Sequence, residues 1–368
     1  MTSASETRLH QRLARLIEAH GPLSMAQFMA LVLGEPRQGI YANAAIGKAG
    51  HFTTAPEISQ IFGELVGLCL VQAWLDQGQP APFVLAEAGP GRGTLMADLL
   101  RAARTVPDFL AAAELHLIET SAPLRTLQAE CLARVSPGLQ PHFHAGLDTL
   151  PVDRPLFLVA NEFLDALPIH QFVRTESGWR ERVVALDETG SFVFATGQVV
   201  PAPSDDPELD FLEASPAREA WMQALAARLA NRPGLGLLID YGDLALKGET
   251  LQALRHHQRA HPLDDPGSAD LSSHVAFAPL AIAARRAGCT VHGPVTQAAF
   301  LAALGGAARL ARLQRALPSA AASLAAGYER LTHAAEMGVL FKAMAVTGRQ
   351  ALPPPGFASS EPPVEKEG

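Results

Sequence analysis

The stretch FVLAEAGPGRGT, residues 83–94, decides the fold of this chain. Its first five residues are a short apolar run that predicts a buried strand, and an apolar helix pattern follows from about Thr94 to Arg104. Glycines between a strand and a helix let the backbone approach a ligand, and the helix N-terminus favours negatively charged ligand groups. The stretch therefore predicts an α/β sheet with a ligand site at the glycine turn.

The spacing of the glycines distinguishes between nucleotide-containing ligands. A dinucleotide fingerprint has the form G-x-G-x-x-G, but with Gly89 as its first glycine the third position falls on Thr94. The chain has instead Glu87 followed by Gly89, Gly91 and Gly93, which resembles the first motif of class I S-adenosylmethionine methyltransferases. Because that cofactor carries no phosphate, the turn must pack against a methionine and an adenosine.

A second acidic residue supports the same ligand. Glu119 ends the next apolar run, residues 115–119, where a carboxylate can accept hydrogen bonds from both ribose hydroxyls. The alternative is an ordinary tight turn, with Glu119 as a solvated strand end. The residues expected to bind the cofactor are Glu87, Gly89, Gly91, Gly93, Thr94, Glu119 and Asn161.

Two carboxylates and an amide follow a strongly apolar strand at residues 156–160. The carboxyl ends of parallel strands meet at one crevice, so Asn161, Glu162 and Asp165 should face the same site as the glycine turn. Acids buried there without partners would cost free energy, which indicates a function. Paired carboxylates can bind a guanidinium, so we expect Glu162 and Asp165 to be catalytic, with Asn161 lining the pocket. The alternative is that Asn161 caps a helix and both acids pair with surface arginines.

The alternation of strands and helices over residues 81–350 predicts a doubly wound, mostly parallel α/β sheet. Insertions are expected around 170–230, in part antiparallel, and around 256–335. Residues 1–80 are expected to form a helical N-terminal cap, whose last two helices begin at capping boxes at Ser24 and Thr54. Residues 351–368 are rich in Pro, Ser and Glu and are expected to be a disordered tail.

Composition excludes several classes of protein. The net charge of −8 argues against a protein that coats nucleic acid, and no apolar run reaches the roughly 18 residues of a membrane helix. The first 15 residues lack the apolar core of a secretory signal, so a cytoplasmic location is expected. Three distant cysteines and loosely spaced histidines at 256, 257, 261 and 274 predict no metal site.

Taken with further segments, these motifs resemble the MidA-type class I methyltransferases over roughly residues 20–347. The matching segments are FTTAPEISQ (52–60), FGE (62–64), GPGRGTL (89–95), NEF (161–163), DALP (165–168), IDYG (239–242), TLQ (250–252), residues 265–270, MG (337–338) and LFK (340–342). The chain departs from the family pattern at His51 and Ala276, where Asp is expected.

The resemblance implies S-adenosylmethionine as cofactor and an arginine of a protein as substrate. The family includes a mitochondrial complex I assembly factor, which acts in the matrix by symmetric dimethylation of the 49-kDa subunit of NADH:ubiquinone oxidoreductase. A protein partner, such as a subunit of that type, is therefore expected here, with no nucleic acid and no membrane span; a homodimer is left open.

Other residues and other functions stay open at this stage. Five residues could contact the substrate or form a lid over the crevice: Thr54, Glu57, Ser59, Asp240 and Tyr241. Capping alone explains the first two, and the last two could instead close the sheet. The rival functions are an assembly chaperone on a methyltransferase fold, a nucleotide-dependent oxidoreductase and a small-molecule methyltransferase.

Overall fold

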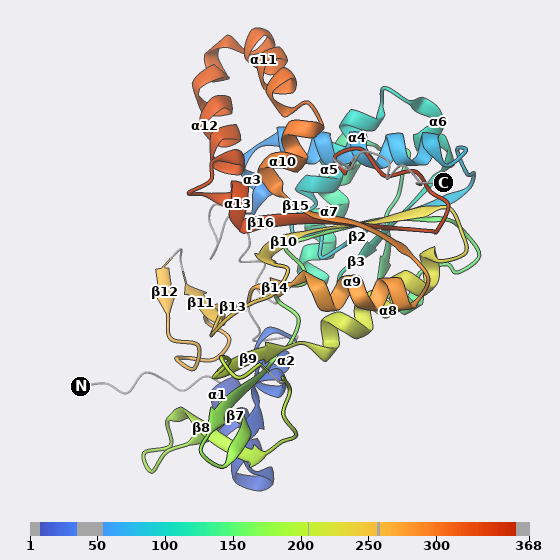
Figure 1. The fold of residues 1–368 in the computed structure, drawn as a ribbon. Coiled ribbons are helices and arrows are strands. Elements are labelled where there is room, and N and C mark those ends of the chain that lie inside the picture. The colour runs from blue at the N-terminus through green and yellow to red at the C-terminus, as the bar shows by residue number, and fades with distance from the viewer. Residues whose placement is uncertain (1–7, 35–53, 205, 256–257, 358–368) are drawn as a thin grey trace, which may run out of the picture.

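The computed structural model describes residues 8–34, 54–204, 206–255 and 258–357. Its centre is a sheet with the strand order β15-β16-β10-β5-β2-β3-β4 (Figure 1). These strands are Phe83–Ala88 (β2), Ala113–Ile118 (β3), His142–His144 (β4), Leu156–Asn161 (β5), Gly234–Asp243 (β10), Thr290–Thr296 (β15) and Phe341–Thr347 (β16). In this order β16 runs antiparallel to both of its neighbours, β10 and β15, and the other pairs are parallel. The predicted doubly wound, mostly parallel α/β fold is confirmed.

Helices cover both faces of this sheet. Alternate residues of β2 enter opposite cores: Phe83 and Leu85 face one, and Val84 and Ala86 face the other. The first core includes α4 (Gln60–Asp76) and α5 (Thr94–Ala103), and the second includes α8 (Pro216–Leu229) and α9 (Phe277–Arg286). Helices α6 (Pro107–Ala112) and α7 (Ala122–Val135) flank β3 in the chain. Burial on both faces explains why the strands are continuous apolar runs.

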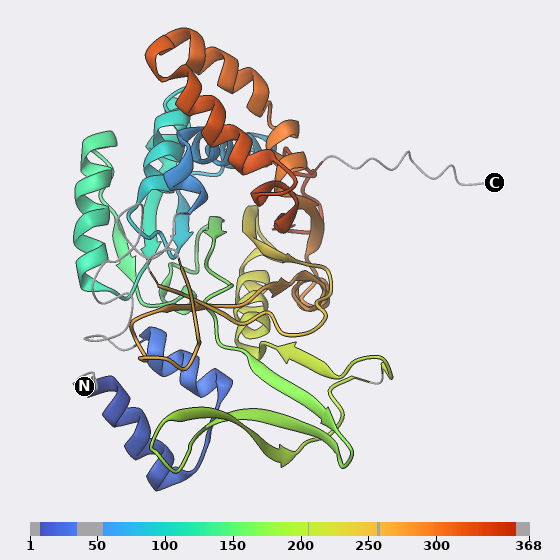
Figure 2. The same cartoon turned by 90° about the vertical axis from the view of Figure 1, so that its left-hand side faces the viewer.

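The first two helices lie apart from this sheet, in a small lobe (Figure 2). The lobe contains α1 (Arg8–His20), α2 (Met25–Gly34) and the strands β1 (Leu23–Ser24), β6 (His170–Thr175), β7 (Gly178–Leu186), β8 (Phe192–Val199) and β9 (Phe211–Ala214). The capping box at Ser24 is formed, since its Oγ accepts the Gln27 amide at 3.1 Å. Strand β1 pairs with β7, Leu23 opposite Val184, so residues 8–34 join the first insertion.

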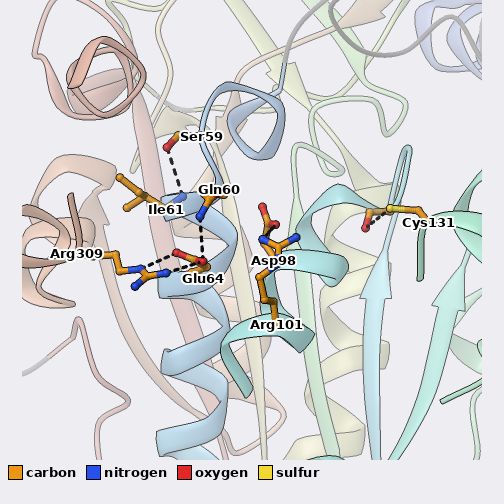
Figure 3. Close-up of polar contacts among 9 residues, drawn as sticks. Ser59, Gln60, Ile61, Glu64, Asp98, Arg101, Cys131 and Arg309 are labelled. Atoms are coloured by element: carbon orange, nitrogen blue, oxygen red, sulfur yellow. Dashed lines mark hydrogen bonds and ion pairs between the residues drawn. The ribbon is translucent and has the colours of Figure 1, made fainter. Parts of the chain in front are cut away.

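The segment expected as one helix beginning at Thr54 is two helices. Helix α3 (Ala55–Ile58) ends at Ser59, whose backbone is extended, with φ −154° and ψ 131°. The Ser59 hydroxyl then accepts the Ile61 amide at 3.3 Å and caps α4 (Figure 3). Thr54 makes no side-chain capping bond, so the capping box predicted there is wrong. A side chain able to cap a new helix explains the break.

The later insertions are short strands and a group of helices. They are β11 (Gln252–Arg255), β12 (Gln258–Ala260), β13 (Asp270–Ser272), β14 (Val275–Ala276), α10 (Gln297–Ala303), α11 (Gly306–Ala316), α12 (Ala321–Thr332) and α13 (Met337–Leu340), with a short 3-10 turn at Pro318–Ala320. Another 3-10 turn, Leu147–Thr149, precedes β5. Helices α11 and α12 form a hairpin that projects from the body (Figures 1 and 2). Its root is held by Arg309, which donates two hydrogen bonds to Glu64 of α4, at 2.7 and 2.8 Å (Figure 3).

The end of the described chain is ordered against the first core. Phe357 is buried, with its ring 5.2 Å from that of Phe300, and Cys69 donates to the carbonyl of Pro355. The expectation of disorder is therefore wrong for residues 351–357, because an aromatic anchor offsets the entropy of ordering this Pro-rich segment. Residues 358–368 lie outside the described residues. Within the described chain, the helices are too short or too polar to span a membrane.

Candidate functional site

A cavity of about 650 Å³ opens at the carboxyl ends of the central strands. Strands β3 and β5 lie on opposite sides of β2, so the loops that follow them diverge and leave a crevice. Its wall combines the glycine turn, the ends of β3 and β5, and the start of α3. Met29 and Leu33 of α2 also line it, a contribution of the small lobe that no local motif indicated.

The glycine turn has a backbone that only glycine adopts readily. Gly89, Gly91 and Gly93 have φ of +65°, +53° and +81°. A Cβ on Gly89 would stand 2.9 Å from Cδ2 of Phe163, whose ring lies 5.3 Å from that of Trp221. Both rings line the cavity. The turn is therefore shaped both by its own backbone and by an aromatic pair from two other elements.

Two acids line the cavity on either side of this turn. Glu87 is buried, its Oε2 is without a partner within the described chain, and burial raises its pKa to about 8. Glu119 accepts the Ser121 amide at 2.7 Å and Gln128 Nε2 at 3.2 Å, and burial raises its pKa. Gln128 also donates to the carbonyl of Gly91 at 2.8 Å. Gln128 thus links the turn to Glu119. Sequence reasoning missed this role, because a single glutamine in the middle of a helix gives no signal.

Asn161 and Glu162 bring acceptor oxygens to the opposite wall. The Asn161 Oδ1 is buried and without a partner in the described ranges, while its Nδ2 donates to Glu162 Oε1 at 3.1 Å. The amide of Ala55 also donates to that oxygen, at 2.8 Å. Glu162 has a left-handed backbone, φ +49°, and burial raises its pKa to about 7, with a further rise from Asp165. Strain and a raised pKa together mark a functional position.

Asp165 lies behind this wall and is absent from the cavity lining. Its Oδ2 accepts the hydroxyl of Tyr241 at 2.9 Å, and its Oδ1 is buried without a partner in the described part of the chain. Burial raises the pKa of Asp165. The buried Arg218 donates to the carbonyls of Leu164 and Asp165, at 2.7 and 3.1 Å. Sequence reasoning missed Arg218 because nothing near it in the chain resembles a motif.

Asp240 and Tyr241 also lie behind the cavity wall, so neither contacts the cavity directly. Asp240 Oδ2 accepts the amides of Phe163, Leu164 and Asp165, and its Oδ1 accepts the amide of Tyr241. These residues therefore support the turn after β5. The sequence left open whether they contact the substrate or close the sheet; their side-chain contacts instead hold this turn.

Of the remaining candidates, some line the cavity and some do not. Thr54 and Glu57 line the cavity, and Glu57 Oε1 lies 3.7 Å from Arg92 Nε and 3.5 Å from Thr94 Oγ1. Ser59 does not line it and instead caps α4. No group of three or more His, Cys, Asp or Glu side chains suited to a metal occurs among the described residues. His256 and His257 lie outside them.

The donors and acceptors of the cavity fit S-adenosylmethionine. Its ribose hydroxyls and amino group are hydrogen-bond donors, and Glu119 and the unpartnered Oε2 of Glu87 are acceptors. The faces of its adenine ring are apolar, and most of the other residues that line the cavity are apolar as well. The glycine at position 89 lets the turn pack against Phe163, where a Cβ would collide.

Similar proteins point to the same cofactor. A crystal structure of a Burkholderia thailandensis protein bound to S-adenosyl-homocysteine is 27% identical to this chain, with a TM-score of 0.85, covering 98% of this chain and 97% of that one. A native structure from the same organism is 28% identical, with a TM-score of 0.82 and 97% coverage of both chains.

Curated relatives match nearly the whole chain. The protein arginine methyltransferase NDUFAF7 homologue of Drosophila melanogaster is 35% identical, covering 92% of this chain and 84% of the relative. The human protein arginine methyltransferase NDUFAF7 is 33% identical, covering 94% and 85%. A family model described as S-adenosyl-L-methionine-dependent methyltransferase matches residues 65–295. The chain therefore belongs to this methyltransferase family and takes S-adenosylmethionine as its cofactor.

Proposed function

We propose that the protein transfers a methyl group to an arginine side chain of a protein substrate. The observation that carries the proposal is the wall of acceptors after β5. There Asn161 Oδ1 lacks a partner in the described chain, and Glu162, whose backbone is left-handed, lines the cavity. A guanidinium offers five N–H donors and stays charged at ordinary pH. A site rich in acceptors and poor in donors suits it.

Different residues would bind the cofactor and orient the substrate. S-adenosylmethionine supplies the methyl group, and Glu87, Glu119, Thr94, Asn161 and the three glycines are the residues we expect to hold it. Glu162 would orient the guanidinium, and a cation beside it favours the ionised carboxylate over the acid. Asp165 acts from behind Glu162, where its charge already raises the pKa of that residue. Methyl transfer depends mainly on this positioning.

The substrate we propose is a 49-kDa-type subunit of respiratory complex I, modified by symmetric dimethylation as an assembly step. The names of the relatives support a protein arginine as target, since they are called protein arginine methyltransferases. Those names also place the relatives in mitochondria. For this chain we propose a cytoplasmic location.

The test is methyl transfer from radiolabelled S-adenosylmethionine to the purified 49-kDa-type subunit of the source organism. We expect label in the subunit, recovered as methylarginine after hydrolysis, and loss of at least 100-fold in rate on Glu162→Gln, about 2.7 kcal/mol. Cofactor affinity, measured by calorimetry, should change little in that variant.

The control is Asp98→Asn, another buried carboxyl but one paired with Arg101 on α5 (Figure 3). It should retain the rate. Label in a small molecule, or none in an arginine, would refute the proposal. Full activity of Glu162→Gln would refute the role of that residue.

A further inference from the structure

One carboxylate holds the turn that carries Glu162. Asp240, in β10, is 1% exposed. Its Oδ2 accepts hydrogen bonds from the successive amides of Phe163, Leu164 and Asp165, at 3.2, 2.9 and 3.1 Å. Three successive N–H groups can converge on one oxygen only where the chain curls around it. The curl is therefore fixed by a residue 75 to 77 positions further along the sequence.

The curl begins at Glu162 itself. A left-handed backbone is unfavourable for a residue with a Cβ and persists only where the surroundings impose it. The amide of Glu162 donates to the carbonyl of Ile239 at 2.9 Å, and the next three amides donate to Asp240. Two consecutive residues of β10 therefore accept hydrogen bonds from four consecutive backbone amides. They leave Glu162 little freedom to adopt another backbone conformation.

We infer that Asp240 is a positioning residue for methyl transfer, which fixes the strained turn so that Glu162 presents its carboxylate to the cavity. The inference rests on the proposed function, because the group that Glu162 is positioned to meet is the guanidinium. Asp240 does not line the cavity, so it acts through Glu162 and touches neither substrate nor cofactor.

The partners of Asp240 make an informative substitution available. Among the described residues, the carboxylate accepts hydrogen bonds from four backbone amides. Burial and the neighbouring acids raise the pKa of Asp240, while Arg218 and the Asp165 amide oppose the rise. Asp240→Asn keeps the size of the side chain but removes its charge and replaces one acceptor oxygen with an NH₂, so either the three turn amides or the Tyr241 amide loses its acceptor. Arg218 still holds the carbonyls of Leu164 and Asp165, so the surrounding chain should stay folded.

The experiment is a double-mutant cycle on binding of Nα-acetyl-arginine amide to the protein loaded with S-adenosyl-homocysteine, followed by calorimetry. Nα-acetyl-norleucine amide, which lacks the guanidinium, is the reference ligand. We expect Asp240→Asn to raise Kd for the arginine amide about tenfold, or 1.4 kcal/mol. In the Glu162→Gln background the same substitution should cause no further change.

Two measurements separate positioning from general damage. The affinity for S-adenosyl-homocysteine should stay within about twofold in Asp240→Asn. That limit is well below the roughly tenfold change expected for the arginine amide. Asp98→Asn should lower thermal stability without changing Kd for the arginine amide. If Asp240→Asn does not fold, Asp240→Ser, which removes the carboxylate with a smaller side chain, takes its place in the cycle.

The outcomes identify which statement fails. An unchanged Kd in Asp240→Asn, an equal loss in both backgrounds, or a parallel loss of S-adenosyl-homocysteine affinity would overturn the inference and leave the proposed function standing. If the wild-type protein bound the arginine and norleucine amides equally, the guanidinium site itself would be wrong, and the role inferred for Asp240 would fall with it.

Discussion

Glu87 shows how much the site depends on single ionisable groups. It is buried at the end of β2, lines the cavity and has an Oε2 without a partner in the described residues. Because burial raises its pKa from 4.5 to about 8, the free protein holds it mostly as the neutral acid near pH 7. A cationic ligand group beside it would favour the ionised form. Cofactor binding and the charge of Glu87 are therefore linked.

This raised pKa predicts a pH dependence of stability. The folded protein holds a proton on Glu87 that the unfolded chain loses above about pH 4.5, so stability falls as pH rises from there to about 8. Glu87→Gln should match the wild type at pH 5 and be more stable at pH 8. Chemical denaturation without cofactor at pH 5, 6.5 and 8 measures the two slopes. Parallel curves for the two proteins would contradict the assignment.

At the scale of elements, the strand–turn–helix unit at β2 and α5 depends on its neighbours. Gly89 packs under Phe163, which belongs to the turn after β5 and donates its amide to Asp240 of β10. The glycine turn, the acceptor wall and β10 therefore form one packed layer. A side chain added at Gly89 should therefore affect cofactor binding as well as stability.

Gly89→Ala tests this packing. The new Cβ combines a left-handed strain of about 1 to 2 kcal/mol with a contact of 2.9 Å to Phe163, a residue that cannot easily move. We expect lower stability and at least tenfold weaker binding of S-adenosylmethionine by calorimetry, or 1.4 kcal/mol.

Gly78→Ala is the matched control for that substitution. Gly78 has φ +83° and nothing within 4 Å of its Cβ position. The Gly78→Ala protein should therefore be less stable than the wild type but bind the cofactor with unchanged affinity. Equal effects of both substitutions on binding would show that strain alone, and not the contact with Phe163, explains the result.

At the scale of the whole molecule, distant parts of the chain surround the site. Helix α2 of the small lobe contributes Met29 and Leu33 to the cavity, and the amide of Ala55 in α3 holds Glu162. Helix α12 packs on α3, where a Cβ on Gly327 would lie 3.1 Å from the carbonyl of Ile58. The projecting hairpin is thus in contact with the element that orients Glu162.

The C-terminal segment gives a prediction at this scale. Phe357→Ala removes a buried ring from the first core and should reduce the free energy of unfolding by about 3 kcal/mol. Leu352→Ala, in the same segment but 64% exposed, should change it by less than about 0.5 kcal/mol. Urea denaturation compares the two. Similar values would mean that the segment does not contribute to the core.

The sequence by itself determined the sheet, the glycine turn and the location of Asn161 and Glu162 at its edge. These follow from local patterns: an apolar run buried on both faces, glycines at fixed spacing, and polar residues directly after a strand. Chain geometry then requires the ends of parallel strands to meet, so the crevice followed without knowledge of any side-chain contact.

Only the tertiary structure decided which polar residues face the cavity and which lie behind it. Asp165 accepts a hydrogen bond from Tyr241, and Asp240 and Arg218 both hold the turn after β5. These contacts join residues 53 to 77 positions apart in the chain. The same holds for residues 8–34, which pack with the first insertion because β1 pairs with β7. Local periodicity shows that a face is buried, but the partner that buries it depends on where distant elements cross.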